Sequence, residues 1–190
     1  MILAKYTIQL PLTNPVQAIY LRSERPMRVR DATADDLPAI VEIYNSTIPH
    51  RTATADTRPI SVADREAWFQ ERDFSRRPIW IADDSGKVSG WLALGDFNFR
   101  PAYHPTAEVA VYIAEPYRGR GIGRLLVKEA LRRGPEFGIK TLIAGVFAHN
   151  AASISLFEGF GFERWAHLPR VAELDGVERD LVYLGLRLTG

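Results

Sequence analysis

The sequence predicts a single α/β domain, and three observations lead to that prediction. The chain has 190 residues, of which 46% are hydrophobic and 25% charged, and this is typical of one globular domain with its own core. Strand-like apolar runs alternate with amphipathic helical patterns in the C-terminal half. Gly and Pro, at 14 and 12 residues, occur near their average frequencies, so no long linker is indicated.

Residues 1–26 differ from the rest of the chain. A short alternation at 6–10 is followed by Pro11, Pro15 and Pro26, which interrupt regular elements. We therefore expect residues 1–26 to form an N-terminal extension and residues 27–190 to form the domain.

The first half of the domain contains two expected helices and three expected strands. Asp35 and Asp36 suit the positive N-terminus of a helix, and Ser61 with Asp64 is a weaker form of the capping box. Residues 83–86 carry a turn signal between two apolar runs, which predicts a hairpin. The expected elements are a strand at 28–30, a helix ending near 47, a helix from 61, and strands at 79–82 and 88–94.

The second half alternates strands with helices. Its helix at 121–133 has an apolar stripe opposite a basic one, and the apolar run at 142–147 is typical of a central buried strand. Gly161 ends the helix that follows. The expected elements are strands at 109–113, 142–147 and 182–188 and helices at 121–133 and 151–160. We assign Trp68, Trp80 and Trp91 to the core.

Charge and residue usage exclude several classes of function. The 24 basic and 23 acidic residues give a net charge of +1, so no global field attracts nucleic acid or an anionic membrane. The absence of Cys excludes disulfides and thiol nucleophiles, and it suits a reducing compartment such as the cytoplasm. The four His residues lie too far apart in sequence to suggest a metal site, and we expect none.

A glycine-rich turn between the strand at 109–113 and the next helix has the geometry that binds phosphate groups. The first amides of a helix have no internal partner and carry the positive end of its dipole. A Walker loop is excluded because no Lys followed by Ser or Thr is present, and Arg124 and Leu126 exclude a dinucleotide fingerprint. The alternatives left open are an anion site and a basic turn that only joins strand to helix.

Two segments together carry a resemblance to a known family. Arg118-x-x-Gly121-x-Gly123 is followed by Asn150-x-x-Ser153 and then by Leu156-Phe157-Glu158-Gly159-Phe160-Gly161-Phe162. This series resembles the GNAT family of N-acetyltransferases, which use acetyl-coenzyme A. The resemblance implies the GNAT fold, a mixed and mostly antiparallel sheet with one splayed strand pair, flanked by helices. The residues it assigns to the coenzyme are Val111, Tyr112, Ile113, Arg118, Gly119, Arg120, Gly121, Ile122, Gly123, Asn150 and Ser153, with helix capping as the alternative role of Asn150.

A finer resemblance covers residues 27–188 and includes the segments at 43–48, 65–69 and 100–108. They are similar to the branch that contains phosphinothricin acetyltransferase. This implies a homodimer that acetylates the amino group of a small amino-acid-like acceptor of the phosphinothricin, methionine sulfone or methionine sulfoximine type. Two positions depart from the branch: Phe157 replaces a His or Tyr, and His104 stands where Arg is frequent.

Each chemical need of acetyl transfer to an amine has a candidate residue. The resemblance places Glu108 as the general base, and backbone amides near Val111 and Tyr112 would stabilise the oxyanion. Because Phe157 cannot donate a proton, we expect solvent or the product ammonium to protonate the leaving thiolate, with Tyr112 as the weaker alternative. The candidate acceptor residues are Phe97, Phe99, Arg100, Tyr103 and His104. A peptide or protein N-acetyltransferase and a non-catalytic acetyl-CoA-binding module remain as alternatives.

Overall fold

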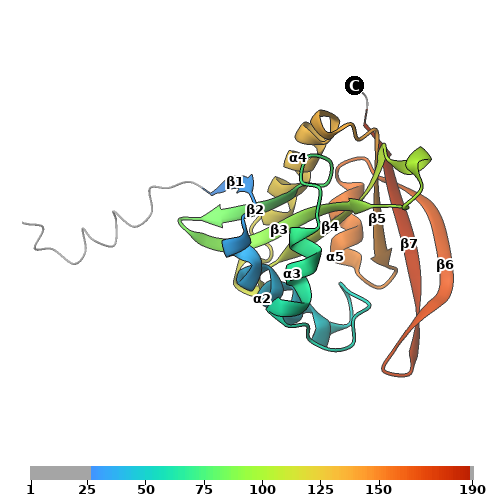
Figure 1. The fold of residues 1–190 in the computed structure, drawn as a ribbon. Helices are drawn as coiled ribbons and strands as arrows, with labels where there is room; N and C mark the ends of the chain where they lie inside the picture. The colour runs from blue at the N-terminus through green and yellow to red at the C-terminus, as the bar shows by residue number, and fades with distance from the viewer. Residues whose placement is uncertain (1–26, 189–190) are drawn as a thin grey trace, which may run out of the picture.

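The computed structural model describes residues 27–188, so the extension expected at 1–26 lies outside the described residues. Its centre is a seven-stranded sheet in the order β1-β2-β3-β4-β5-β7-β6 (Figure 1). The strands are β1 (Arg28–Asp31), β2 (Ile79–Asp84), β3 (Lys87–Asp96), β4 (Thr106–Ile113), β5 (Thr141–Phe147), β6 (Glu163–Leu174) and β7 (Val177–Arg187). The α-helices are α2 (Leu37–Thr47), α3 (Val62–Gln70), α4 (Ile122–Arg133) and α5 (Ala151–Glu158).

One strand pair divides the sheet. All neighbouring strands are antiparallel except β4 and β5, which are parallel and pair only at Thr106 with Thr141, Ala107 with Leu142 and Glu108 with Ile143. Beyond Glu108 the two strands separate, although β4 continues to Ile113 and β5 to Phe147. The expected mixed, mostly antiparallel sheet with a splayed pair is confirmed.

Helices cover the two faces of the sheet with separate cores. Helices α4 and α5 pack with Trp80 and Leu92 on one face, and α2 and α3 pack with Ile81 and Trp91 on the other. In Figure 1, α2 and α3 lie in front of the sheet. Trp80 and Trp91 are buried as expected, whereas Trp68 is half-buried at the edge of the second core. The alternation of Trp80 and Ile81 between faces follows from the two-residue period of a strand.

The capping box predicted at Ser61 is present, and Asp36, one of the acidic residues expected near the start of the first helix, belongs to a second box. The Ser61 hydroxyl accepts a hydrogen bond from the Asp64 amide, and the Asp64 carboxylate accepts one from the Ser61 amide. Thr33 and Asp36 form a similar box before a short 3₁₀ turn that leads into α2. These reciprocal bonds satisfy amides that a helix leaves unpaired.

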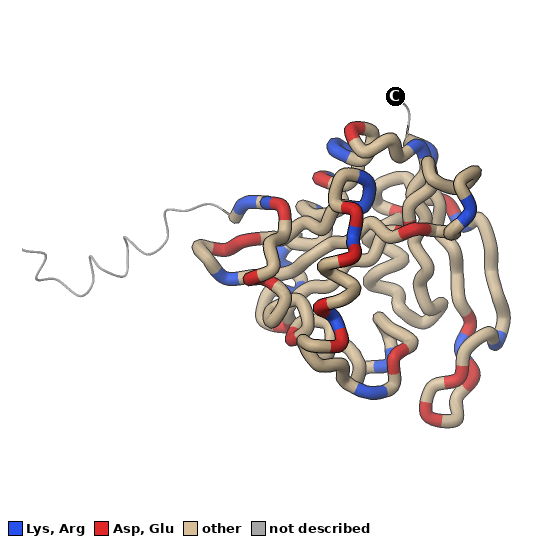
Figure 2. Tube along the Cα trace, viewed as in Figure 1, with Lys and Arg blue, Asp and Glu red and all other residues tan. Residues whose placement is uncertain are grey.

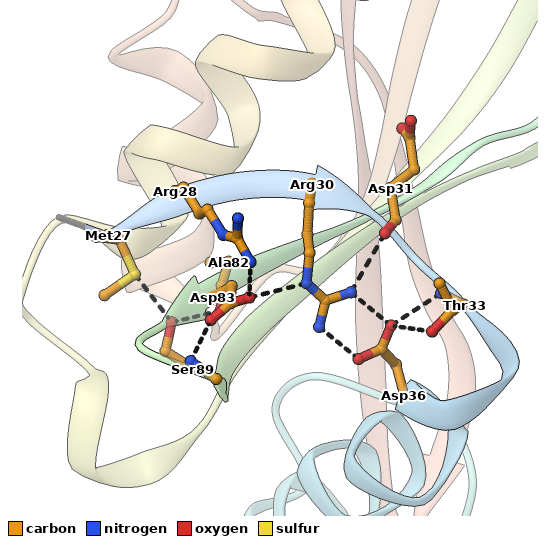
Figure 3. A network of polar contacts seen from close by, with 10 residues as sticks. Met27, Arg28, Arg30, Asp31, Thr33, Asp36, Ala82, Asp83 and Ser89 are labelled. Atoms are coloured by element: carbon orange, nitrogen blue, oxygen red, sulfur yellow. Dashed lines mark hydrogen bonds and ion pairs between the residues drawn. The ribbon is translucent and has the colours of Figure 1, made fainter. Parts of the chain in front are cut away.

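An ionic network fixes β1 against β2 and α2 (Figure 3). Arg30 donates to both Asp36 oxygens at 2.6 and 2.7 Å and to Asp83 at 2.9 Å, and Arg28 also donates to Asp83. Burial alone would raise the pKa of Asp36 and Asp83, but the hydrogen bonds from Arg30 and from nearby backbone amides, together with the arginine charges, outweigh it and lower both pKa values. Charge-assisted pairs of this kind orient the edge strand.

The hairpin of β6 and β7 was not predicted by the sequence analysis. Only a strand at 182–188 was expected, and β6 was missed because most of its residues are exposed and Pro169 interrupts its pattern. Asp175 and Gly176 turn the chain between the two strands with positive φ values of 51° and 76°. An Asp-Gly pair is a hairpin signal, so it could have indicated this turn.

Acidic and basic residues are both interspersed along the trace (Figure 2). This distribution fits the net charge of +1. Among residues 27–188 no helix is long and apolar enough to cross a membrane. The same residues contain no cluster of three His, Asp or Glu side chains that could hold a metal ion.

Candidate active site

A cavity of about 790 Å³ opens where β4 and β5 separate. Its lining comes from strands β4, β5 and β7, the turn before α4 and its first turn, helix α5 and the loop after α2. Of the predicted site residues it contains Glu108, Val111, Tyr112, Ile113, Arg118, Gly119, Gly121, Ile122, Gly123, Asn150 and Ser153. The structure therefore brings the two predicted coenzyme segments and Glu108 to one cavity.

The N-terminus of α4 provides a bare backbone surface in this cavity. Gly119 and Gly121 have φ values of +74° and +82°, and a Cβ at either position would meet no atom within 4 Å. Such φ values favour glycine, and no side chain caps the helix at Gly121. At Gly123 a Cβ would lie 3.1 Å from Leu156 Cδ2, so this glycine lets α4 approach α5 closely. The first amides of α4 are thus accessible to an anion.

Basic side chains accompany this helix terminus, although not all of them line the cavity. Arg118 and Arg124 do, and Arg124 lies 4.9 Å over the Phe160 ring. The Arg120 guanidinium lies 5.6 Å over the Tyr117 ring, and Arg120 is not part of the lining. A free helix terminus with two adjacent guanidinium groups suits a pyrophosphate.

The Asn150 side chain is already engaged in the fold. Its Oδ1 accepts a hydrogen bond from the Ser153 amide at 3.1 Å, so it caps α5, and its Nδ2 donates to the Thr52 carbonyl at 3.0 Å. The alternative role of a helix cap is therefore realised in the structure. The coenzyme contact of Asn150 stays a prediction, and it would compete with these bonds.

The loop after α2 closes one side of the cavity and was missed by the sequence analysis. Residues 52–55 belong to the lining. Neighbouring bonds hold the loop: His149 Nε2 lies 2.8 Å from the Arg51 carbonyl oxygen, and Arg51 contacts both Asp175 oxygens at 2.7 and 3.0 Å. This stretch of small and polar residues has no periodicity, so its place over the cavity depends on contacts that are distant in sequence.

Glu108 lies at the point where β4 and β5 separate. Its side chain is open to the cavity and has no hydrogen-bond or ion-pair partner among residues 27–188. Desolvation by the surrounding protein raises the pKa of its carboxyl group, with no opposing hydrogen bond. An unpaired carboxylate with a raised pKa is a suitable proton acceptor.

The ladder between β3 and β4 determines which β4 amides face the gap. The Ala114 amide donates to the Ser89 carbonyl, and β4 pairs with β3 without a register shift. By the alternation of an antiparallel ladder, the Tyr112 amide is then directed toward β3 and the Val111 amide toward the gap. Of the two amides expected to stabilise an oxyanion, only that of Val111 has this orientation.

Two aromatic side chains bear on proton donation. The Tyr112 ring stacks on Trp91 at 4.5 Å and contacts Tyr44 at 5.1 Å, and burial raises the pKa of Tyr112 so that its phenol stays protonated. Phe157 is 2% exposed and packs on Phe162 at 5.0 Å. Neither side chain is a ready acid for a leaving thiolate at neutral pH.

None of the predicted acceptor residues Phe97, Phe99, Arg100, Tyr103 and His104 belongs to the cavity lining. Phe99 is 84% exposed and Tyr103 42%, so the segment lies mostly at the surface. Phe97 is its link to the cavity, because its ring lies 5.8 Å from that of Tyr103 and 6.5 Å from that of Tyr183, a lining residue. The acceptor role of this segment stays a prediction.

A buried arginine anchors both ends of that segment. Arg77 donates through Nε to Asp96 at 2.8 Å and through Nη2 to the His104 carbonyl at 2.9 Å. Arg77 is 5% exposed, and a buried guanidinium needs such partners to compensate for its lost hydration. Arg77 therefore fixes both ends of the surface segment at 97–104.

Comparison with known proteins identifies the family. The sequence model of the Acetyltransferase (GNAT) family matches residues 37–162. The chain is 47% identical over 164 residues, 86% of its length, to the whole of the Bacillus subtilis protein named "Putative phosphinothricin acetyltransferase YwnH". It is 35% identical over 84% of its length to 94% of the L-methionine sulfoximine/L-methionine sulfone acetyltransferase of Pseudomonas paraeruginosa.

A solved structure agrees with this similarity. The phosphinothricin acetyltransferase of Sinorhizobium meliloti in complex with acetyl-CoA superposes with a TM-score of 0.81 at 29% identity. The superposition covers 85% of this chain and 88% of that one. The chain therefore belongs to the acetyltransferase (GNAT) family.

Proposed function

We propose that this protein transfers an acetyl group from acetyl-CoA directly to the amino group of a small amino-acid-like acceptor. Family membership makes it an N-acetyltransferase with acetyl-CoA as its co-substrate. The observation that carries the finer proposal is the position of Glu108, an unpaired carboxylate with a raised pKa in the same cavity as the bare terminus of α4. A proton acceptor and an anion-binding terminus are what amine acetylation by a coenzyme requires.

The residues that would hold the coenzyme fit that group. The open space at Gly119 and Gly121 leaves room for a pyrophosphate against the first amides of α4, and Arg118 and Arg124 add positive charge. The gap between β4 and β5 has space for an extended chain beside Val111. A coenzyme held in this way would direct its thioester toward the gap that Glu108 borders.

The chemical step uses two groups of this chain, the Glu108 carboxylate and the Val111 amide. Glu108 takes a proton from the acceptor ammonium, directly or through one water, and the neutral nitrogen then attacks the thioester carbonyl. The Val111 amide donates to the oxyanion that forms, and collapse of the intermediate breaks the carbon–sulfur bond. Since neither Phe157 nor Tyr112 is a ready acid, solvent or the product ammonium protonates the thiolate.

The acceptor class follows from the relatives and from the cavity. Their names specify phosphinothricin, methionine sulfoximine and methionine sulfone. Residues 52–55 close one side of the cavity, which favours a free amino acid over a peptide that needs an open groove. We propose an acceptor of this size and polarity.

Steady-state turnover with a panel of amino acids tests this function, with release of free thiol as the signal. The panel contains methionine sulfone, methionine sulfoximine, phosphinothricin, a peptide and a polyamine. We expect turnover with at least one of the first three. Activity only on the peptide or the polyamine would contradict the acceptor class, and coenzyme binding without any turnover would support a non-catalytic module.

We also propose that residues 27–190 form the catalytic domain and that the protein is a cytoplasmic homodimer. The absence of Cys suits a reducing compartment. Several large apolar side chains of the C-terminal strands are exposed, among them Trp165, Val171 and Val177, as expected where two protomers meet. Light scattering after gel filtration measures the mass, and a monomer at micromolar concentration would contradict the dimer.

A further inference from the structure

Gly145 interrupts an otherwise buried central strand. In β5 every residue from Thr141 to Phe147 is buried except this glycine, which is exposed. A glycine inside a strand weakens it and frequently marks a place where a ligand or another backbone approaches closely. Gly145 belongs to the cavity lining, two residues beyond the last pair that joins β5 to β4.

Two functional groups border this bare position. A Cβ at Gly145 would lie 3.5 Å from Glu108 Oε1 and 3.3 Å from Tyr183 Cε1. Tyr183 is the cross-strand partner of Gly145 on β7, and it also lines the cavity. The Tyr183 hydroxyl has no hydrogen-bond partner within residues 27–188. The carboxylate and the ring thus flank one patch of exposed backbone.

The outer side of Tyr183 is supported by the segment at 97–104. The Phe97 ring meets the Tyr183 ring edge-on at 6.5 Å and 84°, and Tyr103 packs against Phe97 at 5.8 Å. Edge-to-face contacts of this kind restrict the rings they join. The surface segment at 97–104 therefore contacts the cavity lining through Phe97, which packs against Tyr183.

We propose that Gly145 and Tyr183 determine which acceptors the enzyme uses. Gly145 leaves space beside Glu108 for the amino-bearing carbon, and the Tyr183 ring packs against the acceptor side chain and limits its size. The favoured substrates are compact α-amino acids whose side chain ends at this ring. The inference rests on the proposed function, because it takes Glu108 as the base.

Acceptor preference tests the role of Tyr183. In Tyr183→Ala we expect the KM for methionine sulfone to rise about 10-fold with kcat changed less, and the ratio of kcat/KM for phenylalanine over methionine sulfone to rise by at least about 10-fold. Tyr183→Leu keeps an apolar side chain on β7 and gives the same direction of change. Trp165→Ala is the matched control, since this aromatic residue of the same hairpin lies outside the cavity.

Gly145→Ala tests the second half of the inference. Its methyl group meets Glu108 and Tyr183, so we expect kcat to fall about 10-fold or more while calorimetry shows unchanged acetyl-CoA binding. In Gly145→Ala/Tyr183→Ala, where the ring is absent, part of the kcat loss is recovered. Circular dichroism verifies the fold of each variant.

The outcomes separate this inference from the proposed function. An active wild type with the same acceptor ratio in Tyr183→Ala, Tyr183→Leu and Trp165→Ala would overturn the role of Tyr183. Full kcat in Gly145→Ala would overturn the role of Gly145. A wild type that binds acetyl-CoA and turns over none of the acceptors would overturn the proposed function and this inference with it.

Discussion

Glu108 has opposite effects on catalysis and on stability. Although Glu108 is exposed to solvent in the cavity, the surrounding protein removes part of the hydration of its carboxylate, and no cation or donor among residues 27–188 compensates for that part. The same desolvation that costs the folded state free energy makes the group a better proton acceptor.

Glu108→Gln should lower kcat by about 10²- to 10³-fold, the usual contribution of a general base. Calorimetric affinity for acetyl-CoA should remain within about twofold, because the anion-binding terminus of α4 does not involve this side chain. Steady-state kinetics near pH 7.5 measure the effect. A variant with wild-type kcat would show that another group takes the proton.

The desolvated Glu108 carboxylate should also make the stability of the folded protein fall as pH rises. A folded-state pKa above the unfolded value means that the wild type is most stable where Glu108 is protonated, and it loses stability as pH rises through the raised pKa. Glutamine does not titrate. Thermal unfolding should therefore give Glu108→Gln a gain in Tm over wild type that is larger at pH 8 than at pH 4. A gain independent of pH would contradict the linkage.

At single positions, the sequence predicted which residues share the cavity better than it predicted their hydrogen-bond partners. Glu108, Gly119 and Gly121 were predicted to belong to one site and line one cavity, while their roles stay predictions. The commitment of the Asn150 amide to Thr52, almost one hundred residues away, has no local signal. The same applies to Arg120, whose guanidinium lies over Tyr117 rather than in the cavity.

Among the elements, the glycine-rich turn is where local sequence and geometry agree most closely. The positive φ of Gly121 and the absence of any side-chain cap leave the terminus of α4 exposed to the cavity. Only the backbone and nearby arginines then determine its affinity for anions.

Gly121→Asp should weaken acetyl-CoA binding by about 10-fold or more, because a carboxylate would face the pyrophosphate at the helix terminus. Gly138→Asp is the matched control. Gly138 also has a positive φ, of 71°, and open space around its Cβ position, but it lies outside the cavity lining. Isothermal titration calorimetry compares the affinities of the two variants for acetyl-CoA. Equal losses in both variants would indicate strain rather than charge as the cause.

Elements with strong periodicity were predictable, and those fixed by distant contacts were not. Helix α4 and strand β5 match the expected ranges closely because burial imposes their patterns. Strand β6 is stabilised by pairing with β7 along an exposed edge, so its sequence shows little alternation. The loop at 51–55 is positioned by Asp175 and His149 and carries no pattern of its own.

At the scale of the whole molecule, residues 27–188 already contain both cores and all seven strands of the described sheet. Met27 packs against the first core, and Ser89 donates a hydrogen bond to its sulfur. The edge strand β1 therefore begins directly after Met27, the first described residue.

A chain that begins at Met27 should fold and keep its kcat, with a Tm within about 3 °C of the full chain, equivalent to about 1 kcal/mol for a domain of this size. Differential scanning calorimetry measures the Tm, and the thiol-release assay measures kcat. A larger drop in Tm would mean that residues 1–26 contribute packing to the domain.

The separation of β4 from β5 has a consequence for hydrogen exchange. In the part of β4 beyond its last pair with β5, alternate amides are bonded to β3, and Val111 and Ile113 face a gap where no strand supplies a carbonyl. In the ligand-free protein, Val111 and Ile113 should exchange with deuterated solvent much faster than Ala110 and Tyr112, so protection alternates residue by residue along one strand. Acetyl-CoA should slow exchange at the unprotected positions, and NMR can follow each amide. The enzyme would then complete its own secondary structure only when its substrate is bound.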